Sequence, residues 1–279
     1  MSPSTLARRA LTLLVATLTL TALSAVPAHA DAGPPPNSMA SMGDSITRAF
    51  NACGWFSDCT SRSFSTGSYS SVNSHYLRIL AKNPAIYGRN HNDARSGAKV
   101  ADMYGQAGTA VSQGVGYVTI LIGANDACTS SESTMTSVTA FRGSIDTALA
   151  RMKSGLPNAK VFIISIPDIK RLWQIGKDNS SARAAWSLFG ICQSMLANPT
   201  STTTTDAARR DRVRQRVIDF NDQLASACVA YGANCMFDNN AVFAYPFVLS
   251  QISTWDYFHP STSGQAVLAS VSYPRGFNW

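Results

Sequence analysis

Short apolar runs and longer segments of helical periodicity alternate along this chain of 279 residues. Three apolar runs, Met39–Met42, Tyr117–Ile122 and Val161–Ile166, predict buried parallel strands. Two weaker runs, Ala85–Tyr87 and Asn234–Phe237, are further strand candidates. Because these runs are continuous rather than alternating, we expect the strands to be covered on both faces.

Segments with helical periodicity separate and follow these runs. Since strand and helix alternate, the pattern predicts an α/β fold, a three-layer α/β/α sandwich around a central parallel sheet. In such a sheet, ligands bind beyond the carboxyl ends of the strands. The predicted helices are Val72–Lys82, Lys99–Ser112, Met135–Met152, Asp206–Tyr231 and Ser263–Ser270.

A polar segment follows two of the predicted strands directly. Gly43-Asp44-Ser45-Ile46 comes after the first apolar run, and Gly123-Ala124-Asn125-Asp126 comes after the run that ends at Ile122. A serine on a tight turn at the end of a buried strand exposes its hydroxyl above the sheet edge, where a substrate carbonyl can reach it. Gly-Asp-Ser is also common turn chemistry, so a nucleophilic role for Ser45 requires a base elsewhere in the chain.

Histidine is the base best suited to activate a serine, and the chain after residue 30 offers His75, His91 and His259. His75 lies in a helix-like stretch and His91 in a polar loop, so we interpret both as solvated or capping residues. His259 precedes a proline, which biases its backbone away from helix, and we predict that it is the base. Asp256 is expected to orient its ring, with a backbone carbonyl between residues 254 and 257 as the alternative.

These segments together resemble the GDSL esterase/lipase family, also called the SGNH hydrolases, and in particular its secreted actinobacterial lipases and phospholipases. The resemblance spans essentially the whole chain after its N-terminal region, and it implies a flavodoxin-like sheet with Ser45 as the nucleophile. It also implies an oxyanion hole made of the backbone N–H groups of Ser45 and Gly97 and the side-chain amide of Asn125. Gly97 lies in the most loosely matching segment, Asn92–Ala98. No metal or other cofactor is implied.

Six cysteines make an even number, which in an exported protein predicts three disulfides. Fifteen pairings are possible in principle. We predict sequential pairing, because it closes two short local loops and leaves one long connection. A zinc site is the competing interpretation, but no cysteine pair has the spacing of a zinc knuckle. The predicted pairs are Cys53 with Cys59, Cys128 with Cys192, and Cys228 with Cys235.

The N-terminal region has the three parts of a signal peptide. Arg8 and Arg9 precede an apolar stretch that ends before Ala28-His29-Ala30, a small-x-small cleavage site. We therefore expect residues 1–30 to be removed and the protein to be secreted, with the Sec and twin-arginine routes both open. A Pro-rich lead-in, 31–37, and a single catalytic domain, 38–279, are expected to follow.

Two insertions carry apolar residues that bear on the choice of substrate. Gly54–Tyr69 contains Trp55, Phe56 and Phe64 and is expected to form a wall beside Ser45. Lys170–Thr205 is rich in aromatic and aliphatic residues, and it forms either a packed subdomain or an acyl-chain groove.

A basic run between Arg209 and Arg216 is interpreted as the solvated face of a helix. The run has no aromatic residues among its arginines, so the sequence does not predict a nucleic-acid partner. The formal net charge of +7 would fall to +5 once Arg8 and Arg9 are removed with the signal peptide, a mild excess that suits approach to anionic lipid surfaces.

The sequence thus predicts a secreted serine ester hydrolase that works through an acyl-Ser45 intermediate without a cofactor. The resemblance favours phospholipid or glycerolipid substrates, in the manner of a phospholipase A, at a membrane or micelle surface. An acetyl-xylan-type carbohydrate esterase is the enzymatic alternative, and a lipid- or glycan-binding module is the non-enzymatic one. A monomer is expected, while the glycerol position attacked and the preferred chain length are left open.

Overall fold

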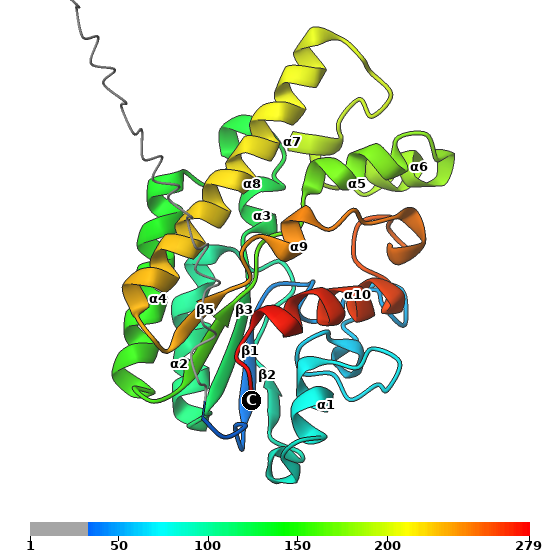
Figure 1. Ribbon diagram of the computed structural model, residues 1–279. Helices are drawn as coiled ribbons and strands as arrows, with labels where there is room; N and C mark the ends of the chain where they lie inside the picture. The colour runs from blue at the N-terminus through cyan, green and yellow to red at the C-terminus, as the bar shows by residue number, and fades with distance from the viewer. Residues whose placement is uncertain (1–32) are drawn as a thin grey trace, which may run out of the picture.

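The computed structural model describes residues 33–279, so the predicted signal peptide lies outside the described residues. Within this range, the centre of the molecule is a parallel sheet of five strands in the order β2-β1-β3-β4-β5 (Figure 1). The strands are β1 Met39–Gly43, β2 Asn90–Asn92, β3 Tyr117–Leu121, β4 Lys160–Ile163 and β5 Cys235–Phe237.

Helices cover both faces of the sheet, which confirms the predicted α/β/α layering. Helices α2, α4 and α8 pack together on one face, while α1 and α10 lie on the other (Figure 1). The α-helices are α1 His75–Leu80, α2 Met103–Gln113, α3 Ala124–Ala127, α4 Val138–Gly155, α5 Ile169–Gly176, α6 Ser180–Leu188, α7 Gln193–Leu196, α8 Thr204–Tyr231, α9 Ala241–Ala244 and α10 Thr262–Ser272. Short 3-10 turns are η1 Thr60–Arg62, η2 Pro84–Ile86, η3 Val100–Asp102, η4 Glu132–Thr134, η5 Leu249–Gln251 and η6 Tyr273–Arg275.

Hydroxyl side chains determine where several helices begin. Ser74, Ser137, Thr203 and Ser261 each stand just before a helix and accept a hydrogen bond from a backbone N–H of its first turn. These bonds satisfy donors that have no partner inside the helix. All five predicted helices are present, with ends that differ from the prediction by a few residues.

One predicted strand is wrong. Ala85–Tyr87 overlaps the 3-10 turn η2, because Pro84 has no N–H for a sheet and the Asn83 side chain caps the turn at the Ala85 N–H, 3.1 Å away. The edge strand is instead β2, whose polar, half-buried residues give no apolar signal. The remaining strand predictions are confirmed, including the weaker one at β5.

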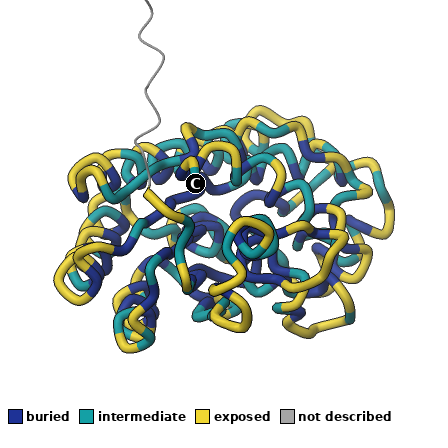
Figure 2. Tube along the Cα trace, turned by 60° about the horizontal axis from the view of Figure 1, so that its bottom comes forward, coloured by how far each residue is buried: buried dark blue, intermediate teal, exposed yellow. Residues whose placement is uncertain are grey.

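The core lies between the sheet and its helices, and Figure 2 shows buried backbone through the middle of the molecule with exposed loops around it. Two residues are placed differently from the prediction. Phe64 is fully buried in this core rather than in a wall beside Ser45. His75 is fully buried as well, because its ring reaches from α1 to the Tyr117 hydroxyl at 3.2 Å and the Ser272 hydroxyl at 2.8 Å.

The hydrogen bonds around His75 define its tautomer. The Ser272 hydroxyl donates to the Leu268 carbonyl, so it accepts from the Nε2–H of His75. Nδ1 therefore accepts the proton of the Tyr117 hydroxyl. Burial, followed by the charge of Arg78, lowers the pKa of His75 from 6.5 to about 3. This histidine is consequently a neutral link between α1, β3 and α10.

The arginines of α8 are not simply solvated, which corrects the interpretation of the basic run. Arg209 donates to the carbonyl oxygens of Ser194 at 2.5 Å and Ala197 at 2.6 Å, and Arg210 is only 1% exposed. Arg210 also stacks over the ring of Trp173, 4.3 Å from its centroid. These side chains fasten the α5–α7 insertion to α8, since they satisfy carbonyls that the insertion leaves without a partner.

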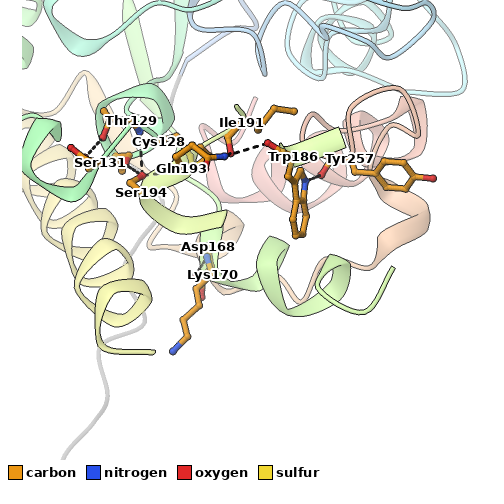
Figure 3. Close-up of a disulfide and its surroundings, with 12 residues drawn as sticks. Cys128, Thr129, Ser131, Asp168, Lys170, Trp186, Ile191, Gln193, Ser194 and Tyr257 are labelled. Carbon is orange, nitrogen blue, oxygen red and sulfur yellow. Dashed lines mark hydrogen bonds between the residues drawn. A yellow bond between two sulfur atoms is a disulfide. The ribbon is translucent and has the colours of Figure 1, made fainter. Parts of the chain in front are cut away.

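Three disulfides join the cysteines in sequential pairs, Cys53–Cys59, Cys128–Cys192 and Cys228–Cys235. Such bonds are typical of proteins from oxidising compartments. Figure 3 shows Cys128–Cys192, next to which the Ser194 N–H donates to the Thr129 carbonyl at 2.9 Å. Across residues 33–279, no helix has both the length and the apolar composition needed to cross a bilayer.

Candidate active site

Ser45 lies on the turn that follows β1, at the carboxyl end of a central strand. Gly43 ends this strand with a φ of 152°. A Cβ at this position would collide with the Leu121 carbonyl of β3 and with the Thr47 side chain, so only glycine allows the chain to turn this tightly. The turn continues through a hydrogen bond from the Phe50 N–H to the Ser45 carbonyl at 3.0 Å. The nucleophile candidate is therefore held by the rigid sheet.

Two glutamines from distant helices hold the backbone on either side of Ser45. Gln106 of α2 accepts from the Gly43 N–H at 2.7 Å and donates to the Gly43 carbonyl at 2.9 Å. Gln265 of α10 donates to the Ile46 carbonyl at 2.8 Å and accepts from the Phe64 N–H at 2.9 Å. Both glutamine side chains are buried, so these bonds fix the serine turn between the two helical layers.

Ser45, His259 and Asp256 form one continuous hydrogen-bonded chain. His259 Nε2 lies 2.7 Å from Ser45 Oγ, and His259 Nδ1 lies 2.6 Å from Asp256 Oδ2. Because a carboxylate only accepts, Nδ1 carries the proton and Nε2 accepts the Ser45 hydroxyl. The structure thus pairs the ring with Asp256, the first of the two orienting groups considered from the sequence. This geometry allows His259 to remove the Ser45 proton during attack.

Asp256 accepts four hydrogen bonds. Oδ2 also accepts from Asn51 Nδ2 at 2.7 Å, and Oδ1 accepts the N–H groups of Phe258 at 2.9 Å and His259 at 3.1 Å. Burial favours a raised pKa for Asp256, but the hydrogen bond and charge of His259 and the backbone donors together hold its pKa below the ordinary value. Asp256 is therefore ionised at neutral pH and can stabilise an imidazolium.

The candidate oxyanion donors come from the segments that follow β1, β2 and β3, with Asn125 in the short helix α3. Within residues 33–279, the N–H groups of Ser45 and Gly97 donate no hydrogen bond. Asn125 Nδ2 donates to the Ala98 carbonyl at 2.9 Å, which joins the Gly97 segment to the Asn125 turn and leaves the second amide hydrogen available. The structure therefore holds Gly97 and Asn125 in linked turns, with donors available for a developing negative charge.

Two buried aspartates flank the nucleophile and the amide. Asp44 is fully buried, and this burial raises its pKa to about 7 against the opposing effects of the Ile46 N–H and His259. Burial likewise raises the pKa of Asp126, which accepts from the Val100 N–H at 2.9 Å and the Thr136 hydroxyl at 2.7 Å. Asp126 thereby connects the segment after Gly97 to α3 a second time.

Two cavities border the hydrogen-bonded chain. The first, here the Ile46 pocket, has a volume of about 60 Å³ and is almost entirely apolar, and it includes the neighbours in sequence of Ser45, Asn125 and His259. The second, the Phe56 pocket, has a volume of about 230 Å³ and reaches Asn125 and His259. The side chain of Phe258 lines both cavities. The Ile46 pocket is lined in part by Ile46, Ala124, Leu172, Ile175, Phe258 and Pro260, and the Phe56 pocket in part by Phe50, Phe56, Phe189, Ile191 and Phe258.

The α5–α7 insertion has structural features of both interpretations considered from the sequence, a packed subdomain and an apolar cavity wall. Its Leu172 and Ile175 line the Ile46 pocket, whereas Trp186 is buried and donates through Nε1 to the Tyr257 carbonyl at 2.9 Å (Figure 3). This bond attaches α6 to the turn that carries His259. The insertion packs as a subdomain and also forms pocket walls.

Sequence reasoning missed the positioning residues Asn51, Gln106 and Gln265. Each contacts the site across a large sequence separation, 205 residues between Asn51 and Asp256 for example, so no local motif identifies them. The described chain contains no group of three or more His, Cys, Asp or Glu residues that could hold a metal ion.

Comparison with known proteins places this site in a family. The profile of the GDSL-like Lipase/Acylhydrolase family matches residues 39–271. The fold is similar to that of a GDSL-like lipase from Parabacteroides merdae, with 15% identity, 88% of this chain and 98% of that chain covered, and a TM-score of 0.53. No curated protein has a matching sequence.

Two further solved structures represent different ester substrates. A family two carbohydrate esterase from Clostridium thermocellum, solved with cellohexaose, has 16% identity, covers 87% of this chain and 64% of its own, and gives a TM-score of 0.51. Phospholipase A1 from Streptomyces albidoflavus is 15% identical, and the match covers 85% of this chain and 95% of the phospholipase, with a TM-score of 0.44. At these identities the likeness to the Parabacteroides merdae and Clostridium thermocellum structures concerns the fold alone. The family profile, which covers most of the chain including all four segments of the site, shows that the chain belongs to the GDSL-like lipase/acylhydrolase family of ester hydrolases.

Proposed function

We propose that the protein is a secreted, monomeric enzyme that hydrolyses phospholipid or glycerolipid esters, in the manner of a phospholipase A. The observation that carries this proposal is the hydrogen-bonded chain from Asp256 through His259 to Ser45, beside an apolar pocket. The signal-peptide pattern and the three disulfides support export to an oxidising compartment.

The reaction proceeds by two acyl transfers. His259 Nε2 takes the proton of Ser45 as Oγ attacks the ester carbonyl, and the N–H groups of Ser45 and Gly97 with the Asn125 amide stabilise the oxyanion. His259 then protonates the leaving alcohol, and the C–O bond breaks to give acyl-Ser45. Water, deprotonated by His259, attacks the acyl group, and His259 returns this proton to Ser45 Oγ as the acyl–Oγ bond breaks, which releases the fatty acid and the free serine.

A carbohydrate esterase is the second candidate, and the size of the Ile46 pocket favours it. A cavity of about 60 Å³ accepts a short acyl group such as acetyl, whereas a long chain must continue elsewhere, for example into the Phe56 pocket of about 230 Å³. The apolar lining and the neighbouring aromatic residues favour the lipid ester, because a fatty acyl chain gains free energy from their burial.

The test is to incubate the purified protein with phosphatidylcholine, triacylglycerol and acetyl-xylan and to identify the products. Fatty acid release from either lipid supports the proposal, while release of acetate alone selects the carbohydrate esterase. Ser45→Ala should abolish hydrolysis in a protein that folds and is secreted normally. His259→Ala should be comparably severe, and the double variant no worse than either, because the two residues act in one step. Activity of Ser45→Ala near that of the wild type contradicts the mechanism.

A further inference from the structure

Large apolar side chains gather on the surface beside the Phe56 pocket. Trp55, Phe56 and Trp255 are each more than half exposed, at 57%, 52% and 51%, and Leu188 is 77% exposed next to the partly exposed Phe189. The rings contact one another. The ring centroid of Trp55 lies 6.4 Å from that of Trp255 and 5.0 Å from that of Phe56, and the centroids of Phe56 and Phe189 are 5.4 Å apart. We call these five residues the tryptophan patch. The four rings form a contiguous exposed apolar surface, which Leu188 adjoins in sequence at Phe189, and surfaces of this kind mark binding sites.

The tryptophan patch is continuous with the catalytic chain. The ring of Phe56 also contacts that of Phe50, with centroids 6.1 Å apart, and the centroid of Phe50 lies 5.0 Å from that of the His259 ring. Phe56 and Phe189 line the Phe56 pocket, which reaches His259. Two residues of the patch therefore line a pocket that reaches the site, and a ligand that touches the patch has a route along aromatic side chains towards His259.

The segments that form the patch carry no unpaired exposed charge: Asp58, which is exposed in the same loop as Trp55 and Phe56, is paired with Arg48, whose Nε lies 2.8 Å from its Oδ2. Residues 50–57 and 186–191 contain no Asp, Glu, Lys or Arg, and 253–257 contains only Asp256, which is 3% exposed. A neutral surface suits the boundary of a lipid layer, where burial of a charge is costly and where tryptophan is favoured. A binding site for an acidic or basic protein would instead present charges of the opposite sign.

The patch is also held in place. The Cys53–Cys59 disulfide closes the loop that carries Trp55 and Phe56, and Phe56 itself is held at a φ of 45°, a conformation that aromatic residues rarely adopt. The Trp186 bond to the Tyr257 carbonyl fixes α6 against the turn next to Trp255. Exposure of the rings is thus maintained by the fold.

We propose that the tryptophan patch docks the protein onto a zwitterionic lipid surface, with the rings inserted at the level of the head groups. Docking places the entrance of the Phe56 pocket on the lipid layer, so an ester can pass to Ser45 without crossing water. This inference rests on the proposed lipid-ester function and adds the partner surface to it.

The test measures binding to phosphatidylcholine vesicles by co-sedimentation, in a Ser45→Ala background that leaves the lipid intact. The combined variant Trp55→Ser, Leu188→Ser, Trp255→Ser changes only residues outside the linings of both pockets. The matched control is Tyr87→Ser, which removes a side chain that is 78% exposed and precedes the amino end of β2, at the sheet edge opposite the site.

We expect the combined variant to lose at least about tenfold in vesicle partitioning, because most of the inserted apolar area is removed. Tyr87→Ser and an increase in salt should leave partitioning unchanged, since the patch is neutral. With Ser45 restored, the combined variant should hydrolyse a soluble monomeric ester as the wild type does, which also shows that it is folded.

Three results overturn the proposal. In the first, the combined variant binds vesicles as tightly as the Ser45→Ala parent. In the second, vesicle binding weakens with salt or requires anionic lipid, which would show that it is electrostatic. In the third, the combined variant loses binding to cellulose or xylan while its vesicle binding is unchanged. The last result identifies the patch as a sugar platform. The failure of the wild type to hydrolyse any ester would refute the proposed function instead, and it leaves the vesicle measurement unaffected.

Discussion

Replacement of Asp256 by asparagine tests the hydrogen bond between Asp256 Oδ2 and His259 Nδ1, which orients the catalytic ring. The Asp256 carboxylate accepts hydrogen bonds at both oxygens. Oδ2 accepts from His259 Nδ1 and Asn51 Nδ2, and Oδ1 accepts from two backbone N–H groups. An asparagine has one oxygen, so its NH₂ group must face one of these two sets of donors. If the oxygen stays with the backbone, the NH₂ faces His259 and selects the tautomer in which Nε2 carries the proton.

A His259 ring with its proton on Nε2 cannot accept the Ser45 proton. The carboxylate charge that stabilises the imidazolium is lost as well. We therefore expect kcat/KM to fall by about 10⁴-fold, equivalent to about 5.5 kcal/mol, as for the same change in a serine protease triad. KM should change little, because Asp256 is absent from the lining of the Ile46 pocket and, although it belongs to the lining of the Phe56 pocket, is only 3% exposed.

The assay is steady-state hydrolysis of a soluble monomeric ester by Asp256→Asn and the wild type, with circular dichroism and thermal melting to show that both are folded. Asn51→Ala is the matched comparison, since it removes one donor to the same carboxylate while leaving the His259 contact in place, and it should lose far less activity. A folded Asp256→Asn enzyme within tenfold of the wild type would refute the reasoning, because some other group would then orient the ring.

Two further predictions concern acid stability and chain-length preference. Because His75 stays neutral down to a pKa of about 3 when folded but has a pKa of 6.5 when unfolded, the unfolded state binds more protons below pH 6.5. The free energy of unfolding should thus fall by about 2 kcal/mol because of this group as the pH is lowered from 6.5 to 5. In urea titrations at these two pH values, His75→Gln should lose about 2 kcal/mol less unfolding free energy than the wild type. Equal losses in the two proteins would contradict this prediction. Phe258→Ala should join the two pockets and raise the ratio of long-chain to acetyl-ester kcat/KM by about fourfold per newly buried methylene. A ratio that stays constant across an ester series would show that Phe258 does not separate acyl-binding spaces.

The central strands could be predicted from the sequence because their stability comes from burial on both faces. A continuous apolar run such as Tyr117–Ile122 carries that information locally. Strand β2 carries none, since it lies at the edge and pairs only with β1 through backbone bonds. Its sequence, Asn90–Asn92, resembles a loop, while the apolar Ala85–Tyr87 nearby is excluded from the sheet by Pro84.

The candidate site divides along similar lines. Ser45, Asn125 and His259 follow strands or precede a proline, so short motifs identify them. His75 and Arg210 carry no such signal: both have polar side chains at helical spacing, and their burial depends on distant elements, Ser272 for the former and Trp173 for the latter. Local pattern predicts exposure for a charged or polar helix residue, and only the tertiary packing reverses it.

The turn from Asp256 to His259 has a consequence for how the protein ages and loses activity. Asp256 and His259 are three residues apart and are hydrogen-bonded to each other, so they move together, and two side-chain contacts join this turn to the distant Ser45 segment, His259 with Ser45 at 2.7 Å and Asn51 with Asp256 at 2.7 Å. If the turn from Asp256 to His259 loosens, the enzyme loses activity while the sheet, the disulfides and the helical layers are still intact. We therefore expect an assay of activity to detect loosening of this turn earlier than a measurement of global folding does.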